Sequence, residues 1–241
     1  MIPSRLLVVT AVAPEAAAVL RGARSRFGDA EPVERALPGG YPLTSVGPLD
    51  VVVAGVGPAA AAAATATALA LAASASPGYG LAVSSGIAGG FAPTAPIGSV
   101  VVADTIVAAD LGAQTPDGFA DVTELGFGRV RYSCPAADPV ARALREAGRP
   151  TAVGTVLTVS TVTGSAERAA ELLGRHPGAV AEAMEGFGVA EAASGHALPV
   201  LELRTVSNAV GPRDRGAWRI GDALDALAAV YAKLPYATLV G

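Results

Sequence analysis

Short apolar runs alternate along this chain with longer segments of helical periodicity. Predicted strands cover 5–10, 43–46, 51–56, 81–85, 99–108, 153–159, 180–183 and 200–206, and predicted helices cover 15–24, 58–74, 139–147, 166–173, 185–194 and 222–232. Strands that alternate with helices form a mainly parallel sheet with helices on both faces. Ligands bind beyond the carboxyl ends of the strands in such sheets. The alternation therefore predicts an α/β fold whose functional residues follow strands.

Size and composition fit one domain. The chain has 241 residues, of which 51% are hydrophobic, enough for one sizeable core, so we expect a single domain over 1–241. The net charge is −4, from 17 basic and 21 acidic residues, and the chain lacks the basic stripe of a nucleic-acid partner. Its one cysteine, Cys134, cannot form an internal disulfide, which fits a cytoplasmic protein.

Two further segments bear on location and loops. The Ala-rich segment 57–76 is long enough to span a membrane, but few of its residues are strongly apolar, so we expect a helix packed on a sheet and no membrane partner. The short apolar run near the first residue is better explained as a strand than as a signal peptide. The segment 111–133 is rich in Gly, Asp and Pro, which predicts a long loop or a hairpin.

Glu15 comes shortly after the first predicted strand, near the start of the next helix. A carboxylate at this position can hold a water molecule and accept its proton. Pro14 and Glu15 are equally typical of a helix start, where an acidic side chain complements the helix dipole. Position alone leaves both interpretations open.

Met184 and Glu185 follow the predicted strand 180–183. An ionised carboxylate only accepts hydrogen bonds, so Glu185 could bind both the 2′- and the 3′-hydroxyl of a ribose. Met184 would supply a soft apolar surface under the sugar. A helix-initiating Glu beside a core Met explains the pair equally well.

Ser207 and Asn208 close the predicted strand 200–206. The Asn amide can donate to O6 of a purine and accept from a protonated N7, which is the pattern of a 6-oxopurine such as hypoxanthine. The simpler alternative is an Asn that caps a turn. An amide is no general acid, so the N7 proton would come from water or from another group, for which Asp214 is the nearest candidate in the sequence.

Two Gly-rich segments are predicted to be turns after strands. They are Gly55-Val56-Gly57 and 85–90, and the second makes Gly86 and Ile87 candidate substrate contacts. Glycine lets the backbone approach a ligand closely. Neither segment is a complete dinucleotide-binding fingerprint, so the sequence gives little support for NAD.

In their order and spacing, these segments resemble the purine nucleoside phosphorylase/5′-methylthioadenosine nucleosidase superfamily. The similarity runs through 10–15, 55–57, 85–91, 97–101, 183–185 and 204–208. Within this superfamily the chain most resembles the futalosine hydrolase family of menaquinone biosynthesis. That likeness is carried by 109–113, 117–119, 124–128, 183–186 and 207–218.

The resemblance implies a three-layer α/β/α sandwich around a mixed, partly barrel-like sheet. It implies that Glu15 activates water, that Met184 and Glu185 bind ribose, and that Asn208 stands where adenine-specific nucleosidases have a base-reading aspartate. Ile87 stands where those nucleosidases often have a serine in their first Gly-rich turn. The predicted site comprises Glu15 and Asn208 as catalytic residues, and Gly86, Ile87, Met184, Glu185, Ser207 and Arg213 as substrate contacts.

The implied reaction is hydrolysis of futalosine to hypoxanthine and dehypoxanthine futalosine, by a homo-oligomer of two or more copies and without a cofactor. His176 and His196 lie far apart in the sequence, so no metal site is expected. The benzoate-type tail of futalosine calls for an apolar channel that ends in a cation. Arg213 or Arg215 could supply the cation, and Phe119 or Phe127 could line the channel. The residue that stacks on the base is left open between Val162 and Thr163.

Other activities remain open at this point. A phosphorylase needs cations beside its Gly-rich backbone, and no Arg lies near Gly55 or Gly86 in the sequence, whereas Glu15 would repel phosphate. These residues favour hydrolysis. The alternatives are a 6-oxopurine nucleoside phosphorylase, a methylthioadenosine/S-adenosylhomocysteine-type nucleosidase, and a non-catalytic nucleoside-binding protein.

Overall fold

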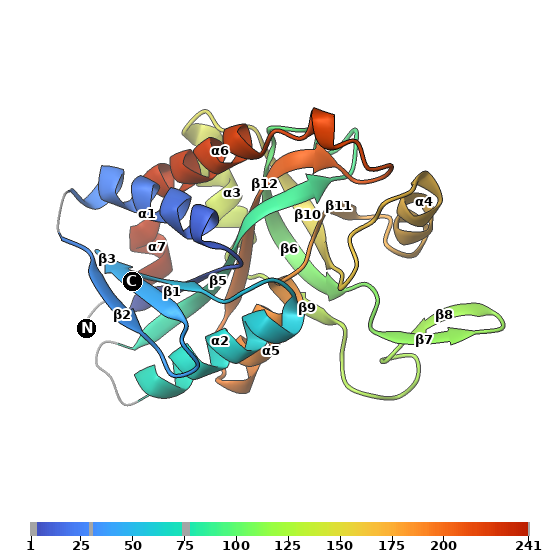
Figure 1. Cartoon of the computed structure of the whole chain (residues 1–241), viewed down its shortest axis with the longest axis horizontal. Coiled ribbons are helices and arrows are strands. Elements are labelled where there is room, and N and C mark those ends of the chain that lie inside the picture. The colour runs from blue at the N-terminus through green and yellow to red at the C-terminus, as the bar shows by residue number, and fades with distance from the viewer. Residues whose placement is uncertain (1–3, 29–30, 74–77, 241) are drawn as a thin grey trace.

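The computed structural model describes residues 4–28, 31–73 and 78–240, and it confirms the predicted three-layer α/β/α architecture (Figure 1). Ten strands form one mixed sheet within these residues, in the order β11-β10-β6-β12-β5-β1-β4-β3-β2, with β9 paired to β6. A separate hairpin joins β7 to β8. The strands are β1 (Arg5–Thr10), β2 (Val33–Ala36), β3 (Pro42–Val46), β4 (Leu49–Val53), β5 (Tyr79–Gly90), β6 (Val100–Ala108), β7 (Gly112–Thr115), β8 (Gly118–Asp121), β9 (Arg131–Ser133), β10 (Thr151–Thr158), β11 (Ala179–Ala183) and β12 (Val200–Ala209).

The sheet closes on itself at one end. β11 pairs in parallel with β10 and antiparallel with β5, so β5, β12, β6, β10 and β11 form a closed barrel. β1 and β4 continue from β5 in parallel and carry the sheet outward to β3 and β2. The partly barrel-like sheet implied by the resemblance is therefore present.

Helices cover both faces of this sheet. α1 packs on α6 and α2 packs on α5; Figure 1 shows α1, α3 and α6 on one side of the strands and α2 and α5 on the other. The apolar strands supply the core: Leu6, Leu7, Val8 and Val9 of β1 are fully buried. The helices are α1 (Ala13–Phe27), α2 (Pro58–Ala72), α3 (Ala137–Glu146), α4 (Ala166–Arg175), α5 (Gly186–Gly195), α6 (Ile220–Lys233) and α7 (Tyr236–Val240), with a 3-10 turn η1 (Arg215–Ala217).

The Gly-rich segment 85–90 is not the predicted turn but the second half of strand β5. It pairs with β12 as far as Gly90 and, on its other side, with β11 at Gly89 and Gly90. The other Gly-rich segment is the predicted turn, because Gly55 and Gly57 adopt φ of 97° and 98°, which other residues rarely adopt. These angles also end β4 at Val53, three residues before the predicted strand end.

Other differences from the sequence-based expectation are local. The segment 111–133 contains a hairpin, β7–β8, which is one of the two predicted forms, whereas the strands β9 and β2 and the helix α7 were not predicted. Ser74, the last residue of the predicted second helix, lies outside the described residues. Within the part of the chain that the structure describes, no helix is long and apolar enough to cross a membrane.

Candidate active site

Three of the predicted site residues, together with Gly57 of the predicted Gly-rich turn, gather at the carboxyl ends of the strands. Glu15 follows β1, Gly57 follows β4, Glu185 follows β11, and Asn208 lies near the end of β12. The second half of β5 runs among them, because it pairs with β12 on one side and reaches β11 on the other. The topology thus brings together segments that are far apart in the sequence.

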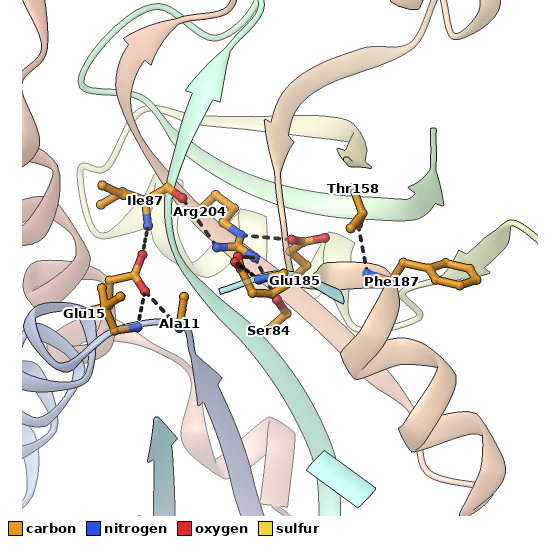
Figure 2. Close-up of polar contacts among 11 residues, drawn as sticks. Ala11, Glu15, Ser84, Ile87, Thr158, Glu185, Phe187 and Arg204 are labelled. Carbon is orange, nitrogen blue, oxygen red and sulfur yellow. Dashed lines mark hydrogen bonds and ion pairs between the residues drawn. The ribbon is translucent and has the colours of Figure 1, made fainter. Parts of the chain in front are cut away.

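Three backbone N–H groups hold the Glu15 carboxylate (Figure 2). Ala11 and Val12 donate to Oε2 at 3.0 and 3.3 Å, and Ile87 of β5 donates to Oε1 at 2.9 Å. Glu15 therefore does reach back to the start of α1, as a helix-initiating residue would. The bond from Ile87 in addition ties it to the Gly-rich half of β5, which a purely helix-capping role does not require.

Burial is the strongest influence on the pKa of Glu15. The side chain is 4% exposed, and this desolvation raises the pKa of Glu15 above its ordinary value, although nearby Arg204 and the Ile87 N–H lower it. Gly86 makes room for the carboxylate, because a Cβ there would lie 2.3 Å from Glu15 Oε1 and 2.8 Å from Arg204 Nη1. A base with a raised pKa accepts protons more readily.

Arg204 is a buried charged residue beside the predicted site to which the sequence interpretation assigned no role. It is 1% exposed, and Figure 2 shows it between Glu15 and Glu185. Its Nε donates to Glu202 at 2.9 Å, and its Nη2 donates to Ser84 at 2.9 Å and to Glu185 at 3.2 Å. Burial lowers the pKa of Arg204, but the nearby carboxylates of Glu202 and Glu185 raise it by more. The net pKa therefore lies above its ordinary value, and the guanidinium stays charged. The sequence did hold a signal for this residue, because Glu202 and Arg204 are charged residues inside the otherwise apolar strand β12.

The surroundings of Arg204 correct one sequence-based argument. No Arg lies near Gly86 in the sequence, yet Arg204 lies beside Gly86 in space. Its charge is already matched by Glu202 and Glu185, and Glu15 contributes a further carboxyl group nearby. One cation among three acidic groups makes a poor phosphate site, so the preference for water over phosphate now has a structural basis.

Glu185 is fixed from both sides. Its Oε1 accepts from the N–H of Gly57 at 3.2 Å, and its Oε2 accepts from Arg204. The start of α5 is anchored as well, because the N–H of Phe187 donates to Thr158 of β10 at 2.9 Å (Figure 2). Met184 beside it is half-buried. The carboxylate therefore keeps one orientation, as a group that binds two adjacent hydroxyls must.

Asn208 lies at the edge of a cavity of about 80 Å³. Its Nδ2 donates to the Ala209 carbonyl at 3.0 Å, and its Oδ1 accepts from the hydroxyl of Ser207 at 2.9 Å. Ser207 is buried, and its hydroxyl also contacts the Ala88 carbonyl at 3.3 Å. The hydrogen bond from the Ser207 hydroxyl thus orients the Asn208 amide.

The same cavity collects other residues. Val162 and Thr163 line it, together with Arg213, Trp218 and a buried carboxylate, Glu182, that sequence reasoning missed. Arg213 is exposed, and its guanidinium carbon lies 5.5 Å from the centre of the Trp218 ring.

Four predicted candidates lie elsewhere. Arg215 also faces the Trp218 ring, at 5.7 Å, without lining the cavity, and Asp214 accepts from the N–H of Gly216 in the exposed turn η1. Phe119 lies under Arg175, 4.3 Å from its guanidinium carbon, and Phe127 is 68% exposed. The structure does not bring these side chains into the cavity beside Asn208.

No group of three or more His, Cys, Asp or Glu side chains that could hold a metal occurs among residues 4–28, 31–73 and 78–240. Burial lowers the pKa of His176 to about 4, so its imidazole is neutral at pH 7. Arg131 Nη2 lies 3.4 Å from its Nδ1.

Sequence comparisons match nearly the whole chain. The model of the phosphorylase superfamily matches residues 5–238. Futalosine hydrolase of Streptomyces coelicolor is 59% identical over 95% of this chain and 94% of its own. Futalosine hydrolase of Acidothermus cellulolyticus is 46% identical over 95% of this chain and 89% of its own.

Solved structures share the fold. A 5′-methylthioadenosine/S-adenosylhomocysteine nucleosidase from Neisseria meningitidis is 19% identical, with a TM-score of 0.75 over 96% of this chain and 100% of that one. Futalosine hydrolase of Helicobacter pylori is also 19% identical, with a TM-score of 0.76 over 98% and 97% of the two chains. From the family-model match and the identity to the two curated relatives, the chain belongs to the phosphorylase superfamily and, within it, to the futalosine hydrolase family.

Proposed function

We propose that this protein hydrolyses the N-glycosidic bond of futalosine, releasing hypoxanthine and dehypoxanthine futalosine, and so serves menaquinone biosynthesis. The 59% identity to the Streptomyces coelicolor futalosine hydrolase supports the substrate. The observation that carries the reaction type is the Glu15 carboxylate, buried and held by Ile87 beside a guanidinium whose charge is already paired. Such a group can take a proton from water but disfavours phosphate.

Each part of the site has one task in this reaction. Glu15 accepts the proton of the attacking water, whose oxygen bonds to the sugar carbon as the bond to the base nitrogen breaks. Glu185, held by Gly57 and Arg204, accepts hydrogen bonds from the 2′- and 3′-hydroxyls while Met184 lies against the sugar. Asn208 reads the base, and because an amide is no general acid, N7 of the leaving base takes its proton from water or from another group.

The remaining assignments are part of the same proposal. Gly86 and Ile87 approach the substrate through backbone, and Ser207 acts through Asn208. Arg213, exposed at the cavity edge, is the proposed partner for the carboxylate of the substrate tail. The exposed apolar side chains Val12, Val56 and Leu111 are available to an interface in a cytoplasmic homo-oligomer.

The test is hypoxanthine release from futalosine in phosphate-free buffer, by wild type and by Glu15→Gln. Gln keeps the size of the side chain but cannot accept a proton, so the variant should lose about 10²–10⁴-fold in kcat. Thermal unfolding and binding of hypoxanthine would show that the variant is folded.

The other activities give different results. Release that requires phosphate would make the protein a phosphorylase, and a preference for 6-amino substrates would make it an adenine-type nucleosidase. Binding without turnover would support the non-catalytic alternative. Equal rates for wild type and Glu15→Gln would remove Glu15 from the mechanism.

A further inference from the structure

Glu182 is a buried carboxylate that forms no salt bridge among the described residues, although Arg168 is near enough to lower its pKa. It is 6% exposed, and both of its oxygens accept hydrogen bonds from Thr163: the backbone N–H donates to Oε1 at 2.8 Å and the hydroxyl donates to Oε2 at 2.5 Å. The ion pairs of the described residues do not include it. Burying a carboxylate without a direct ion pair costs stability. Such a residue is better explained by a binding role than by folding.

The strand register places Glu182 across from Asn208. Glu182 of β11 pairs with Gly89 of β5, and Asn208 of β12 pairs with the same Gly89 from the other side. Neighbouring strands lie about 4.8 Å apart, so the two Cα atoms are roughly 10 Å apart. Residues directly opposite each other in a sheet point to the same face. Both side chains accordingly line one cavity.

Gly89 keeps the space between them open. A Cβ there would lie 3.3 Å from Asn208 Nδ2 and 2.9 Å from a Val210 methyl group. Any larger side chain at this position would occupy the floor of the cavity. A flat ring can therefore rest over Gly89 with one edge toward Asn208 and another toward Glu182.

The chemistry of the two side chains fits one kind of base. A 6-oxopurine carries N7, O6 and N1–H in sequence around its edge. Asn208 can bind N7 and O6, and the next group along is a donor that needs an acceptor. Each carboxylate oxygen has two lone pairs, so Glu182 keeps acceptor capacity after its bonds from Thr163. A 6-aminopurine has an unprotonated N1, which a carboxylate repels.

We infer that Glu182, positioned by Thr163, accepts a hydrogen bond from N1–H of a 6-oxopurine and rejects 6-aminopurines. This inference rests on the proposed function, since it deepens the base specificity of that same site. Glu182 thereby becomes a specificity residue, and Asn208 alone does not carry the choice of base. A site that hydrogen-bonds one base strongly rejects a base that lacks the matching group, because the buried polar side chain is then left unpaired.

The test measures binding of free hypoxanthine, 1-methylhypoxanthine and adenine by calorimetry, with wild type and Glu182→Gln. Wild type should prefer hypoxanthine to each of the other bases by about 100-fold, as expected where a lost hydrogen bond leaves a charged group unpaired. Gln can turn its amide nitrogen toward an unprotonated N1, so the variant should lose about 10-fold or more for hypoxanthine and gain affinity for adenine. Glu167→Gln, which changes an exposed carboxylate on α4, is the matched control and should behave as wild type.

A structural role for Glu182 predicts something else. If the carboxylate only held Thr163 in place, Glu182→Gln would weaken all three bases by the same factor, and this outcome would overturn the inference. Wild-type protein that does not distinguish hypoxanthine from 1-methylhypoxanthine would overturn it too.

Base binding does not depend on turnover, so the two proposals can fail separately. Wild type that prefers hypoxanthine but leaves futalosine intact would refute the hydrolase and keep the role of Glu182. If wild type hydrolyses futalosine and Glu182→Gln keeps the same base preference, the hydrolase proposal stands and the role of Glu182 is refuted.

Discussion

Glu15 shows how one residue is prepared for proton transfer. Three N–H donors favour its charged form, while burial and the neighbouring carboxylate of Glu185 favour the neutral form. Burial is the strongest of these influences, so the pKa ends above its ordinary value. The N–H groups fix the position of the carboxylate, and the desolvation keeps it basic. Arg204 limits the rise and holds Glu185 at the same time.

This balance predicts the acidic side of the pH–rate profile. Glu15 accepts a proton only when ionised, so kcat/KM for futalosine should fall as the pH drops through a pKa above about 4.3, the ordinary glutamate value. Because the folded-state pKa is raised, protonating Glu15 stabilises the fold, and this group does not cause acid unfolding. Rates between pH 4 and 8, with unfolding followed in parallel, would check this. A profile that stays flat below the pKa of an ordinary glutamate would contradict it.

At the scale of elements, strand β5 connects the parts of the site. Its second half donates the Ile87 N–H to Glu15, makes room for the carboxylate at Gly86, and supplies Gly89 between β11 and β12. A turn at 85–90 would leave these backbone groups without the pairing that fixes them. The continuous strand thus gives the site a rigid floor.

Gly86→Ala should damage catalysis more than folding. The new Cβ would lie 2.3 Å from Glu15 Oε1, so the carboxylate has to move, and a displacement of about 1 Å at a reacting group can cost about 100-fold in rate. Alanine is tolerated in a strand, so we expect a loss of about 10–100-fold in kcat with a small change in Tm. Gly195→Ala, at the end of α5 where no atom lies within 4 Å of the added Cβ, is the control. Unaltered kcat in Gly86→Ala would show that Glu15 does not need its observed position.

At the scale of the whole molecule, the two ends of the sheet differ in task. The carboxyl ends of the strands hold the site, and the opposite end is tied together by buried Asp50 of β4. Asp50 accepts from Arg5 of β1 at 2.7 Å, from Ser45 of β3 at 2.5 Å and from Tyr79 of β5 at 2.7 Å. Burial raises the pKa of Asp50, but these hydrogen bonds outweigh it and bring the pKa below its ordinary value.

Asp50→Asn should therefore lower stability without changing kcat below its Tm. Removing one partner of a mostly buried pair should cost about 1–3 kcal/mol of unfolding free energy at pH 7. Because the folded-state pKa is lowered, the contribution is complete above the unfolded pKa and is lost as the pH falls through the folded one. Urea unfolding at pH 7 and at pH 3 would measure this. A difference between wild type and variant that persists unchanged in acid would contradict the assignment.

Much of the fold and part of the site followed from local pattern. Apolar runs and Ala-rich helical segments gave most strands and helices, because each periodicity is a property of neighbouring residues. The short strand β2, the strand β9 and the helix α7 carry weak signals of their own and form through pairing and packing. Glu15, Glu185 and Asn208 were predicted as site residues because each follows a predicted strand.

Arg204, Glu202 and Glu182 were missed because they lie inside strands instead of after them. A charged residue within a buried apolar run is costly unless it is paired or used, and this was the signal in the sequence. Their roles still depended on register: pairing of β11, β5 and β12 sets Glu182 against Asn208. By itself the sequence determined the α/β layers and the acidic residues at the strand ends, since periodicity and chemistry are local. Only the tertiary structure decided that 85–90 is a strand, that the charge of Arg204 is paired with buried carboxylates, and that Glu182 and Asn208 face one cavity. These features arise from contacts between segments that are remote in the sequence.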